Sequence, residues 1–513
     1  MLRKCVDKVD MVKLKAKYKN VPRAGGVHRA HTAGSARRQF SRAGRELRAA
    51  FDLQLTASLK SLGFPASFHS RSQVLKRVAY LTFGCRLNQY DTETVRTLLQ
   101  RCGGFETVSA RDGADVFVVN TCSVTARADA TARKAIRRIH REYPEAEIVV
   151  TGCYAQRAAD ELAALDGVSA VVGAKDRADI VQLVSSLKAG ETRVAVSPVA
   201  EAVKFLDVPI TEMMERSRAY VKVQEGCNES CSFCIVPQTR GRSRSRAPES
   251  VLDQVRGLVQ SGYVEIVLTG VHVGDYGLDL AHGRRMLADL IAEILQLPGL
   301  ERFRLSSIEP ASVSDEIIDL MADHPKFARH FHIPFQSGSN TVLARMKRRY
   351  RVENFADLIL KIAQRIPGCG IGTDVICGFP GETEADFQAT FDRLVELPIT
   401  YVHPFTYSAR PGSEAQAFED QVPAEAKKRR TQSLKRLTRD KNRAFRQQQV
   451  GKTLQVLFET AAASNDGRVS GLSGNYLRVE AQGQASNRVE AVRITGVSED
   501  GLIGERVDRL AIA

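Results

Sequence analysis

Residues 76–200 alternate short apolar runs with stretches in which apolar residues recur at helical spacing. The apolar runs that predict strands lie at 78–84, 115–120, 147–152 and 169–173. The helical patterns between them lie near 88–101, 125–141 and 155–165. Strands that alternate with helices are typical of a parallel sheet covered by helices. The sequence therefore predicts an N-terminal parallel α/β domain over residues 76–200.

A second set of alternating strands and helices occupies residues 213–447. Its predicted strands lie at 219–224, 265–270, 302–307, 330–335, 370–378 and 401–408. The helical patterns between them include 249–261 and 353–366. Six strand–helix repeats predict a barrel or partial barrel, whose active site lies at the carboxyl ends of the strands.

The pattern changes again near the C-terminus. Residues 425–447 predict one long basic helix, and the chain after Gly451 consists of short strands separated by turn signals. Such strands predict a small all-β barrel or sandwich over residues 448–513. Small β-barrels beside a basic helix often bind nucleic acid, although a fold alone does not define a function.

Positive charge is concentrated in two segments of the chain. The net charge is +15; residues 1–60 hold 15 basic and 4 acidic side chains, and residues 425–446 hold 10 basic and 2 acidic ones. Such segments indicate a polyanionic ligand, and the alternative is a solvated helix face plus a disordered arm. Residues 1–75 show little periodicity and predict a disordered, non-catalytic extension, with a transit peptide or a wrongly chosen start site as alternatives.

No apolar run approaches the roughly 18 residues that a membrane helix needs. The first 20 residues hold seven lysines and arginines and no apolar core, so we expect no secretory signal. The expected location is the cytoplasm, without a membrane partner. In this reducing compartment, clustered cysteines indicate metal binding or catalysis more often than disulfides.

The strongest chemical signal is the sequence CNESCSFC, which holds Cys227, Cys231 and Cys234 directly after the first strand of the second unit. Three thiolates this close together can hold one iron–sulfur cluster and leave its fourth iron without a protein ligand. The alternative is a three-cysteine zinc site. The next histidine, His272, lies 38 residues beyond Cys234, whereas a structural zinc usually has four close protein ligands.

Three further cysteines, Cys85, Cys122 and Cys153, each follow one of the first three predicted strands. Because the carboxyl ends of neighbouring parallel strands lie side by side, the three thiols are expected to converge in one crevice. The alternative is three separate buried cysteines. Convergent thiols again suit a cluster with an open iron. The other four cysteines receive no functional role: Cys5, Cys102, Cys369 and Cys377.

The CxxxCxxC motif after the first barrel strand resembles the radical S-adenosylmethionine (SAM) superfamily, and the two three-cysteine sets together resemble its methylthiotransferase family. The motifs that carry the resemblance are GCRLNQYDTE (84–93), NTC (120–122), TGC (151–153), GCNESCSFCIVPQTRGRSRSR (226–246), HIPFQSGSNTVLARMKRRY (332–350), GFPGET (378–383) and FTYSARPGS (405–413). The resemblance implies a parallel α/β domain, a radical SAM partial (βα)6 barrel and a small all-β domain like the TRAM RNA-binding module.

The resemblance also implies two 4Fe-4S clusters and SAM as cofactors. Cys227, Cys231 and Cys234 would bind the radical-forming cluster, whose open iron chelates the amino and carboxylate groups of SAM. Cys85, Cys122 and Cys153 would bind the auxiliary cluster, which supplies or carries sulfur. The four other expected contacts to cofactor or substrate are Thr269, Gly270, Glu309 and Gln336. Of these, Thr269 and Gly270 resemble a contact to the amino group of SAM; strand-end polar residues can also simply cap helices.

Three substrate classes occur in the family: threonylcarbamoyladenosine in tRNA, isopentenyladenosine in tRNA, and an aspartate of a ribosomal protein. GCRLNQYDTE resembles the first branch, so threonylcarbamoyladenosine beside the anticodon is the expected substrate, although Arg351 stands where the family commonly has threonine. The implied partners are tRNA, an electron donor such as a flavodoxin-type reductant, and a sulfur source that the sequence does not specify. Alternatives from other classes are a non-catalytic iron–sulfur RNA-binding protein and a zinc-stabilised translation factor.

Basic residues near the predicted barrel mouth are interpreted as contacts to RNA phosphates, with a solvated charged face as the alternative. They are Arg240, Arg242, Arg244, Arg246, Arg345, Lys347, Arg348 and Arg349. Tryptophan is absent, so base stacking would fall to tyrosine or phenylalanine, for example Tyr476.

Overall fold

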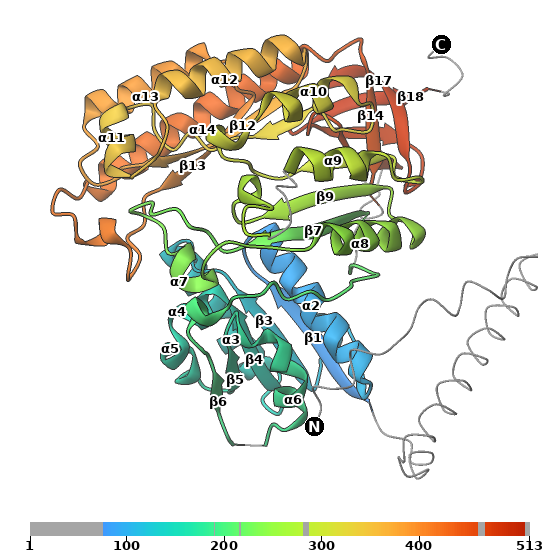
Figure 1. Ribbon diagram of the computed structural model, residues 1–513, viewed down its shortest axis with the longest axis vertical. Coiled ribbons are helices and arrows are strands. Elements are labelled where there is room, and N and C mark those ends of the chain that lie inside the picture. Colours follow the sequence, from blue (N-terminus) through green and yellow to red (C-terminus); the bar gives the residue numbers. More distant parts are fainter. Residues whose placement is uncertain (1–74, 189, 215–216, 281–286, 460–466, 508–513) are drawn as a thin grey trace, which may run out of the picture. The chain divides into compact units, whose positions relative to one another are not determined.

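The computed structural model describes residues 75–188, 190–214, 217–280, 287–459 and 467–507 (Figure 1). The predicted N-terminal extension up to residue 74, including Cys5, lies outside the described residues. Within the described ranges, no helix is both long and apolar enough to cross a membrane.

The N-terminal region contains a parallel sheet with the strand order β2-β1-β3-β4-β5-β6. Its strands are β1 (Lys76–Thr82), β2 (Phe105–Thr107), β3 (Val116–Thr121), β4 (Glu147–Gly152), β5 (Val168–Val172) and β6 (Arg193–Ala195). The direction of winding reverses between β1 and β3. In open α/β sheets such a switch point leaves a crevice outside the carboxyl ends of the strands, where ligands bind.

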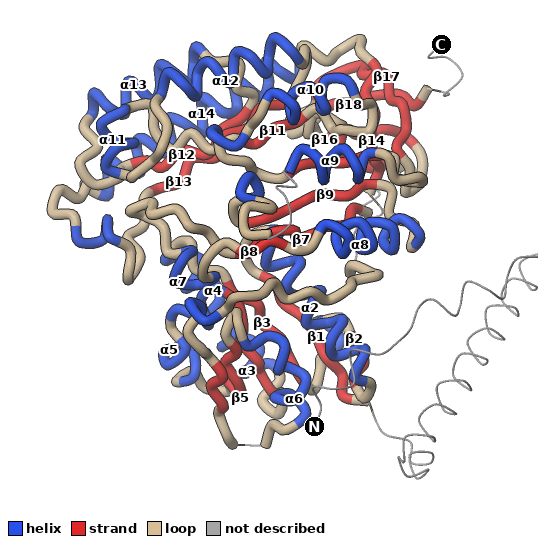
Figure 2. The backbone as a smooth tube through the Cα atoms, in the orientation of Figure 1, coloured by secondary structure: helices blue, strands red, loops and turns tan. Residues whose placement is uncertain are grey.

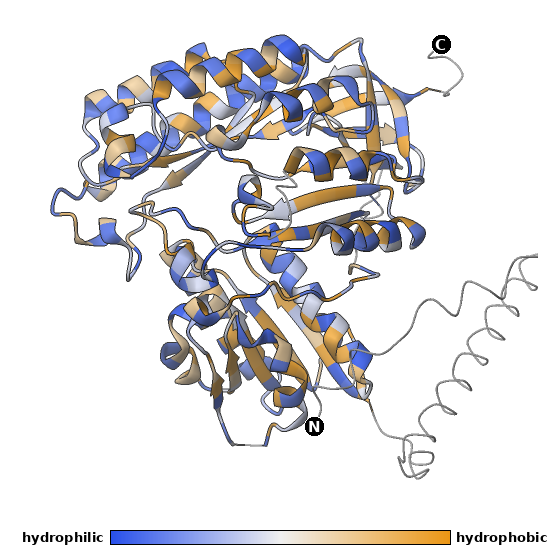
Figure 3. Ribbon diagram, in the orientation of Figure 1, coloured by the Kyte–Doolittle hydropathy of each residue, from blue (hydrophilic) through white to orange (hydrophobic). Residues whose placement is uncertain are grey.

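Helices cover both faces of this sheet (Figure 1). They are α2 (Arg86–Cys102), α3 (Ala126–Glu142), α4 (Cys153–Arg157), α5 (Ala159–Ala163) and α6 (Ile180–Ser185). Val116 and Val118 of β3 pack with Leu99 of α2, whereas Phe117 on the opposite face packs with Ile136 of α3. The apolar colour of these strands in Figure 3 reflects burial on both faces.

The predicted α/β domain is confirmed with two differences. The short edge strands β2 and β6 were not predicted, because three residues are too few to form a recognisable pattern. The helix predicted near 155–165 is interrupted at Ala158, which has non-helical backbone angles (φ −141°, ψ 58°) and separates α4 from α5.

The central region holds two hydrogen-bonded sheets, β10-β9-β7-β8 and β11-β12-β13, in which only β8 is antiparallel to its neighbour. The strands are β7 (Arg218–Glu225), β8 (Arg244–Ser245), β9 (Glu265–Gly270), β10 (Arg302–Leu305), β11 (His330–His332), β12 (Gly370–Cys377) and β13 (Tyr401–Thr406). The helices are α7 (Val236–Arg240), α8 (Pro248–Gln260), α9 (Leu287–Leu295), α10 (Asp315–Asp323), α11 (Asn340–Arg345), α12 (Val352–Arg365) and α13 (Glu384–Glu396). All six predicted strands are confirmed.

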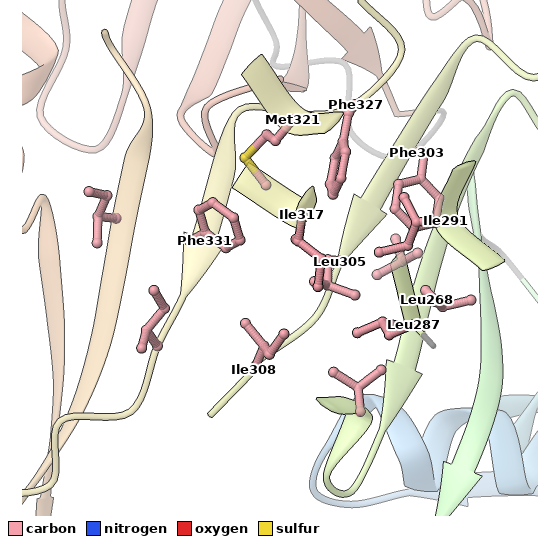
Figure 4. Packing of buried hydrophobic residues seen from close by; sticks show 14 of the residues in the cluster. Leu268, Leu287, Ile291, Phe303, Leu305, Ile308, Ile317, Met321, Phe327 and Phe331 are labelled. Carbon is pink, nitrogen blue, oxygen red and sulfur yellow. The ribbon is translucent and has the colours of Figure 1, made fainter. Parts of the chain in front are cut away.

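One apolar core joins the two central sheets across the gap between β10 and β11. Figure 4 shows Phe303 and Leu305 of β10 on one side of this gap, Phe331 of β11 on the other, and Met321 of α10 with Phe327 between them. The six parallel strands therefore form the predicted partial barrel. Between β10 and β11, where strand-to-strand hydrogen bonding is interrupted, side-chain packing joins the two sheets.

The C-terminal region begins with the predicted basic helix, α14 (Ala424–Gln447), and continues into a small barrel with the closed order β14-β15-β16-β18-β17 (Figure 2). Its strands are β14 (Thr453–Phe458), β15 (Arg468–Ser473), β16 (Arg478–Gln482), β17 (Val489–Val497) and β18 (Leu502–Arg506). Closure leaves no free sheet edge. Of the predicted barrel and sandwich, the barrel is the form observed.

Two buried arginines of β10 hold the C-terminal barrel against the central sheet. Arg302 and Arg304 donate to four of its backbone carbonyl oxygens at 2.9–3.1 Å, and both pair with Glu265 of β9. Burial would raise the pKa of Glu265, but the two guanidinium groups outweigh it and lower that pKa to about 2. The barrel is thus attached by ionic groups that are fully removed from water.

Candidate active site

Cys85, Cys122 and Cys153 lie together at the switch point of the N-terminal sheet. Cys85 is the N-cap of α2, Cys122 directly follows β3, and Cys153 begins α4 after β4. The pKa of Cys122 is raised to about 11, first by burial and further by the neighbouring Cys153 and Cys85. The three thiols are therefore close enough to influence one another electrostatically, although they come from three separate loops.

Two glycines allow these loops to approach each other. Gly84 has φ +101°, and a Cβ there would lie 2.6 Å from Cβ of Cys122 and 3.0 Å from its Sγ. Gly152 has φ +98°, and a Cβ there would lie 2.3 Å from the carbonyl oxygen of Thr121. Since an L side chain would be strained by the backbone and would also collide, glycine is required beside the thiols.

The side chain of Asn88 holds the loops that carry Cys85 and Cys122 in position. The side-chain amide of Asn88 donates to the carbonyl oxygens of Phe83 and Thr121 at 2.8 and 3.0 Å. Phe83 lies two residues before Cys85, and Thr121 immediately precedes Cys122. Two of the three cysteine loops are therefore held by one buried side chain.

The second cysteine set lies in the loop between β7 and α7. The pKa of Cys227 is raised to about 11 and that of Cys234 to about 12, chiefly by burial and also by nearby Cys231. The backbone amides of Glu229 and Val236 face Sγ of Cys227 and Cys234 at 3.4 Å. These two amide donors lower the pKa values of Cys227 and Cys234, against the larger effect of burial, and are placed to stabilise the thiolates that a metal cluster needs.

Glu309 and Arg348 act on the third thiol of this loop. Arg348 donates to Sγ of Cys231 at 3.2 Å and forms an ion pair with Glu309. Burial would lower the pKa of Arg348, but Glu309, Tyr350 and Cys231 together outweigh burial and hold that pKa above its ordinary value. Glu309, predicted to contact cofactor or substrate, therefore lies beside the cysteine loop with a permanently charged partner.

Two cavities adjoin the cysteines. The inner cavity, of about 400 Å³, is lined by residues that include Cys85, Arg86, Gln89, Thr269, His332 and Tyr476. The loop cavity, of about 220 Å³, is lined by residues that include Thr125, Cys234, Gln336, Asp374 and Arg410.

The four residues other than cysteine that were predicted to contact cofactor or substrate do not all lie in one cavity. Thr269 and Gly270 line the inner cavity with Cys85, whereas Gln336 lines the loop cavity with Cys234. Glu309 is not among the residues that line either cavity. Their contacts to cofactor or substrate stay predictions.

Gln336 has a strained backbone. Its φ is +62°, and it is held there by a hydrogen bond from its own N–H to the carbonyl oxygen of Asp374 at 2.8 Å and one from the N–H of Ile376 at 3.0 Å. A left-handed conformation in a residue other than glycine is uncommon and concentrates at functional sites.

A buried ionic network connects the two cysteine sets. Its carboxylates are Asp91 of α2 and Glu225 of β7, and its cations are Arg177, Lys222, Arg240 and Arg244. Lys222 lies 2.6 Å from Asp91, and Arg240 lies 3.0 Å from Asp91 and 2.9 Å from Glu225. Four cations thus surround two carboxylates, so the network carries a surplus of positive charge.

Arg240 makes the connection between the cysteine sets direct. It ends α7, six residues after Cys234, and donates to Oδ1 of Asn88 at 2.6 Å, the side chain that holds the other cysteine loops. Burial would lower the pKa of Arg240, but Cys153, Asp91 and other anionic groups raise it well above its ordinary value. The surplus positive charge therefore lies next to Cys153 and can offset negative charge there.

The predicted phosphate contacts of Arg240, Arg244 and Arg246 are wrong. Their exposed fractions are 3%, 7% and 1%, and their partners are protein carboxylates. Arg348 is likewise buried against Glu309. The sequence could not show this, because the acidic partner Asp91 comes from a distant segment.

The other basic residues of these runs lie near the surface. Arg345, Lys347 and Arg349 form ion pairs with acidic side chains, whereas Arg242 is exposed.

One feature of the sequence indicates the buried ionic network around Asp91 and Glu225. The central strand β7 carries a lysine, Lys222, among apolar residues, and a buried lysine needs an acidic partner.

A groove of about 970 Å³ lies between α14, β13 and the C-terminal barrel, and Arg439 and Arg443 line it with exposed side chains. It shares Tyr401, His403 and Tyr476 with the inner cavity. The groove therefore leads from the basic helix to the cavity beside Cys85.

Among the described residues, no group of three or more His, Cys, Asp or Glu side chains is arranged to hold a single metal ion. Cys377 and Cys369 are buried, in agreement with the core role predicted for Cys377, and Cys102 is exposed at the end of α2.

Family models match both cysteine-bearing regions. The Radical SAM superfamily model matches residues 221–394, which contain CxxxCxxC and most of the partial barrel, and the model of Uncharacterized protein family UPF0004 matches residues 77–173. A radical S-adenosylmethionine methyltransferase, TsrM, from Kitasatospora setae is similar in structure at 18% identity and a TM-score of 0.47, covering 64% of this chain and 73% of that one. The family model over the CxxxCxxC motif and most of the partial barrel defines the class as the radical SAM superfamily.

Similar sequences identify the family within the radical SAM superfamily to which this chain belongs. Threonylcarbamoyladenosine tRNA methylthiotransferase MtaB of Bacillus subtilis (strain 168) is 39% identical over 79% of this chain and 90% of its own length. The tRNA-2-methylthio-N(6)-dimethylallyladenosine synthase of Dictyoglomus thermophilum is 35% identical over 83% of this chain and 97% of its own length. The chain belongs to the methylthiotransferase family and is a transferase that uses SAM and a 4Fe-4S cluster.

Proposed function

We propose that this protein converts N6-threonylcarbamoyladenosine beside the anticodon of tRNA into its 2-methylthio derivative. The observation that carries the proposal is the meeting of Cys85, Cys122 and Cys153 at the switch point, next to a cavity that the barrel strands share. The relative named for threonylcarbamoyladenosine is 39% identical, and the one named for dimethylallyladenosine is 35% identical. The runner-up substrate is therefore isopentenyladenosine.

The two thiol sets fit two 4Fe-4S clusters. Each supplies three thiols that act on one another electrostatically, and the glycines next to Cys122 leave room for no other side chain. Cys227, Cys231 and Cys234 would hold the radical-forming cluster, and the switch-point set would hold the auxiliary cluster. When bound, these groups with SAM supply the electron, the radical and the sulfur that replace a C–H bond by a thiomethyl group.

The chain itself supplies position and charge. Thr269 and Gly270 would contact the amino group of SAM, and Gln336 would contact cofactor or substrate from the loop cavity. Arg348 stabilises the Cys231 thiolate while Glu309 balances the charge of Arg348.

RNA would bind along the groove beside α14. The exposed Arg439 and Arg443 are placed to neutralise phosphates, which makes binding dependent on salt. The small barrel would act as a TRAM-like RNA-binding domain. The remaining expected partner is a flavodoxin-type electron donor in the cytoplasm.

Two cysteine variants test the proposal, with exposed Cys102→Ala as the matched control. Wild type and control are expected to hold about eight iron atoms per chain, and Cys122→Ala and Cys227→Ala about four. Cys227→Ala should form no 5′-deoxyadenosine from SAM. Cys122→Ala should still form it but add no thiomethyl group to a threonylcarbamoyladenosine RNA hairpin.

Full thiomethylation by Cys122→Ala would contradict the two-cluster assignment. If the wild-type protein acted on an isopentenyladenosine hairpin but not on the threonylcarbamoyladenosine hairpin, isopentenyladenosine would be assigned as the substrate instead.

A further inference from the structure

The inner cavity has an unusual balance of charge. The charged residues that line it are two arginines, Arg86 and Arg218, and its lining includes no aspartate or glutamate. A cavity whose charged walls are cationic favours an anionic group on its ligand. Because Cys85 lies on the same wall as Arg86, that ligand would lie next to the auxiliary cysteines.

The two arginines differ in their partners. Arg218 forms an ion pair with Glu459 at 2.5 Å. Arg86, the first residue of α2, has no ion pair with any residue in the part of the chain that the structure describes; its Nη2 donates to the hydroxyl oxygen of Tyr476 at 2.8 Å. Arg86 therefore keeps its charge and further N–H donors available to a ligand.

A second polar atom next to Arg86 also lacks a partner. Oε1 of Gln89, one turn further along α2, is buried and accepts no hydrogen bond from the described residues, and Gln89 lines the same cavity. An unpaired buried acceptor costs free energy unless a ligand donates to it. The cavity thus offers a cation and an acceptor side by side.

We propose that Arg86 binds the free carboxylate of the threonyl group on the substrate base and so selects this base over isopentenyladenosine. The inference rests on the proposed function. A threonylcarbamoyl group carries both a carboxylate and N–H donors, which match Arg86 and Gln89. An isopentenyl group carries neither and would leave both residues unpaired against an apolar chain.

SAM also has a carboxylate, but the family resemblance assigns that group to the open iron of the cluster at Cys227, Cys231 and Cys234. Thr269 and Gly270, the expected contacts to the amino group of SAM, line the same cavity as Arg86, so SAM would lie close by. Its own carboxylate would already be held by the open iron, whereas the carboxylate of the substrate would have no other partner. The carboxylate of the substrate is therefore the better match for Arg86.

The test is a binding cycle between the carboxylate and Arg86, using the protein with its clusters under anaerobic conditions. Three anticodon hairpins are compared, which carry threonylcarbamoyladenosine, its methyl ester, or unmodified adenosine. In the wild type, esterification is expected to weaken binding about 10- to 100-fold, the range for a charge-assisted hydrogen bond. In Arg86→Gln, the acid and the ester should bind equally, and Arg86→Lys should fall between because lysine lacks the planar fork.

Arg443→Gln in the groove is the matched control: it should weaken all three hairpins by the same factor, as expected for a phosphate contact. Iron content, visible absorbance and SAM binding should be unchanged in Arg86→Gln. Equal costs of esterification in wild type and Arg86→Gln would overturn the inference, as would a loss of SAM binding in that variant.

If Arg86→Gln loses iron, the acid and methyl-ester hairpins can still be compared on the wild-type protein. Equal binding of the two hairpins to the wild type would overturn the inference without any variant. A wild type that binds the threonylcarbamoyl hairpin no better than unmodified RNA, and thiomethylates only an isopentenyl hairpin, would instead remove the proposed function on which the inference rests.

Discussion

At the scale of single residues, the site depends on charges that are removed from water. Glu225 is buried and lies within ion-pair distance of Lys222, Arg177 and Arg240. Burial would raise the pKa of Glu225, but these cations outweigh it and lower that pKa well below its ordinary value. The carboxylate is therefore needed to keep several buried cations compensated.

Glu225→Gln should lower the free energy of unfolding by about 3–5 kcal/mol, because it removes one of two carboxylates from a network with four cations. Anaerobic denaturant unfolding measures this. The control is Asp315→Asn, which breaks an exposed pair with Lys361 and should cost less than about 1 kcal/mol. Similar costs for both variants would show that the network contributes no more than a surface pair.

The cysteines and the arginines show what single residues reveal from sequence alone. The positions of the six cysteines followed from motif spacing and from the rule that parallel strands end at one edge. The burial of Arg240 and Arg246 did not follow, because a run of arginines looks the same whether its partners are phosphates or distant carboxylates. Arg86 was visible only as part of a motif until the cavity showed what surrounds it.

At the scale of elements, three loops must approach closely at the switch point. Gly84 permits this approach because a Cβ there would collide with Cys122. The repeated strands and helices were predicted to within a few residues, since long apolar runs have clear periods. Short edge strands, the break at Ala158 and the gap between β10 and β11 could not be predicted, because tertiary packing decides them.

Gly84→Ala should push the loop of Cys85 away from Cys122 and reduce iron to about four atoms per chain, while 5′-deoxyadenosine formation continues. Iron analysis and SAM cleavage assays measure the two effects. Gly103→Ala is the control, since Gly103 also has a positive φ but nothing lies within 4 Å of an added Cβ. Full iron content in Gly84→Ala would mean that the loops can separate without loss of the site.

At the scale of the whole described molecule, buried polar groups attach the C-terminal barrel to the central sheet. His330 of β11 stacks on Tyr476 of the barrel at 4.2 Å, and its Nε2 lies 2.7 Å from the hydroxyl of Tyr401. Burial, and then the nearby charge of Arg304, lowers the pKa of His330 well below its ordinary value. The folded protein therefore keeps this ring neutral.

Stability should fall as the pH drops below about 6.5, because the unfolded chain then binds a proton at His330 that the folded chain does not bind. The contribution of a neutral His330 is fully present above that pH. Glu265, whose folded pKa is about 2, adds a second loss below about pH 4.5. Thermal unfolding between pH 8 and 5.5 measures the first loss, which should be smaller in His330→Asn; an identical pH slope in that variant would contradict the assignment.

The central claim is the reaction on tRNA, and nucleoside mass spectrometry of total tRNA from cells with and without this gene tests it most directly. Loss of the 2-methylthio form of threonylcarbamoyladenosine, with accumulation of the unthiolated nucleoside, is the predicted result. An unchanged threonylcarbamoyladenosine pool would contradict the claim, and loss of the isopentenyl product would identify the sister substrate instead.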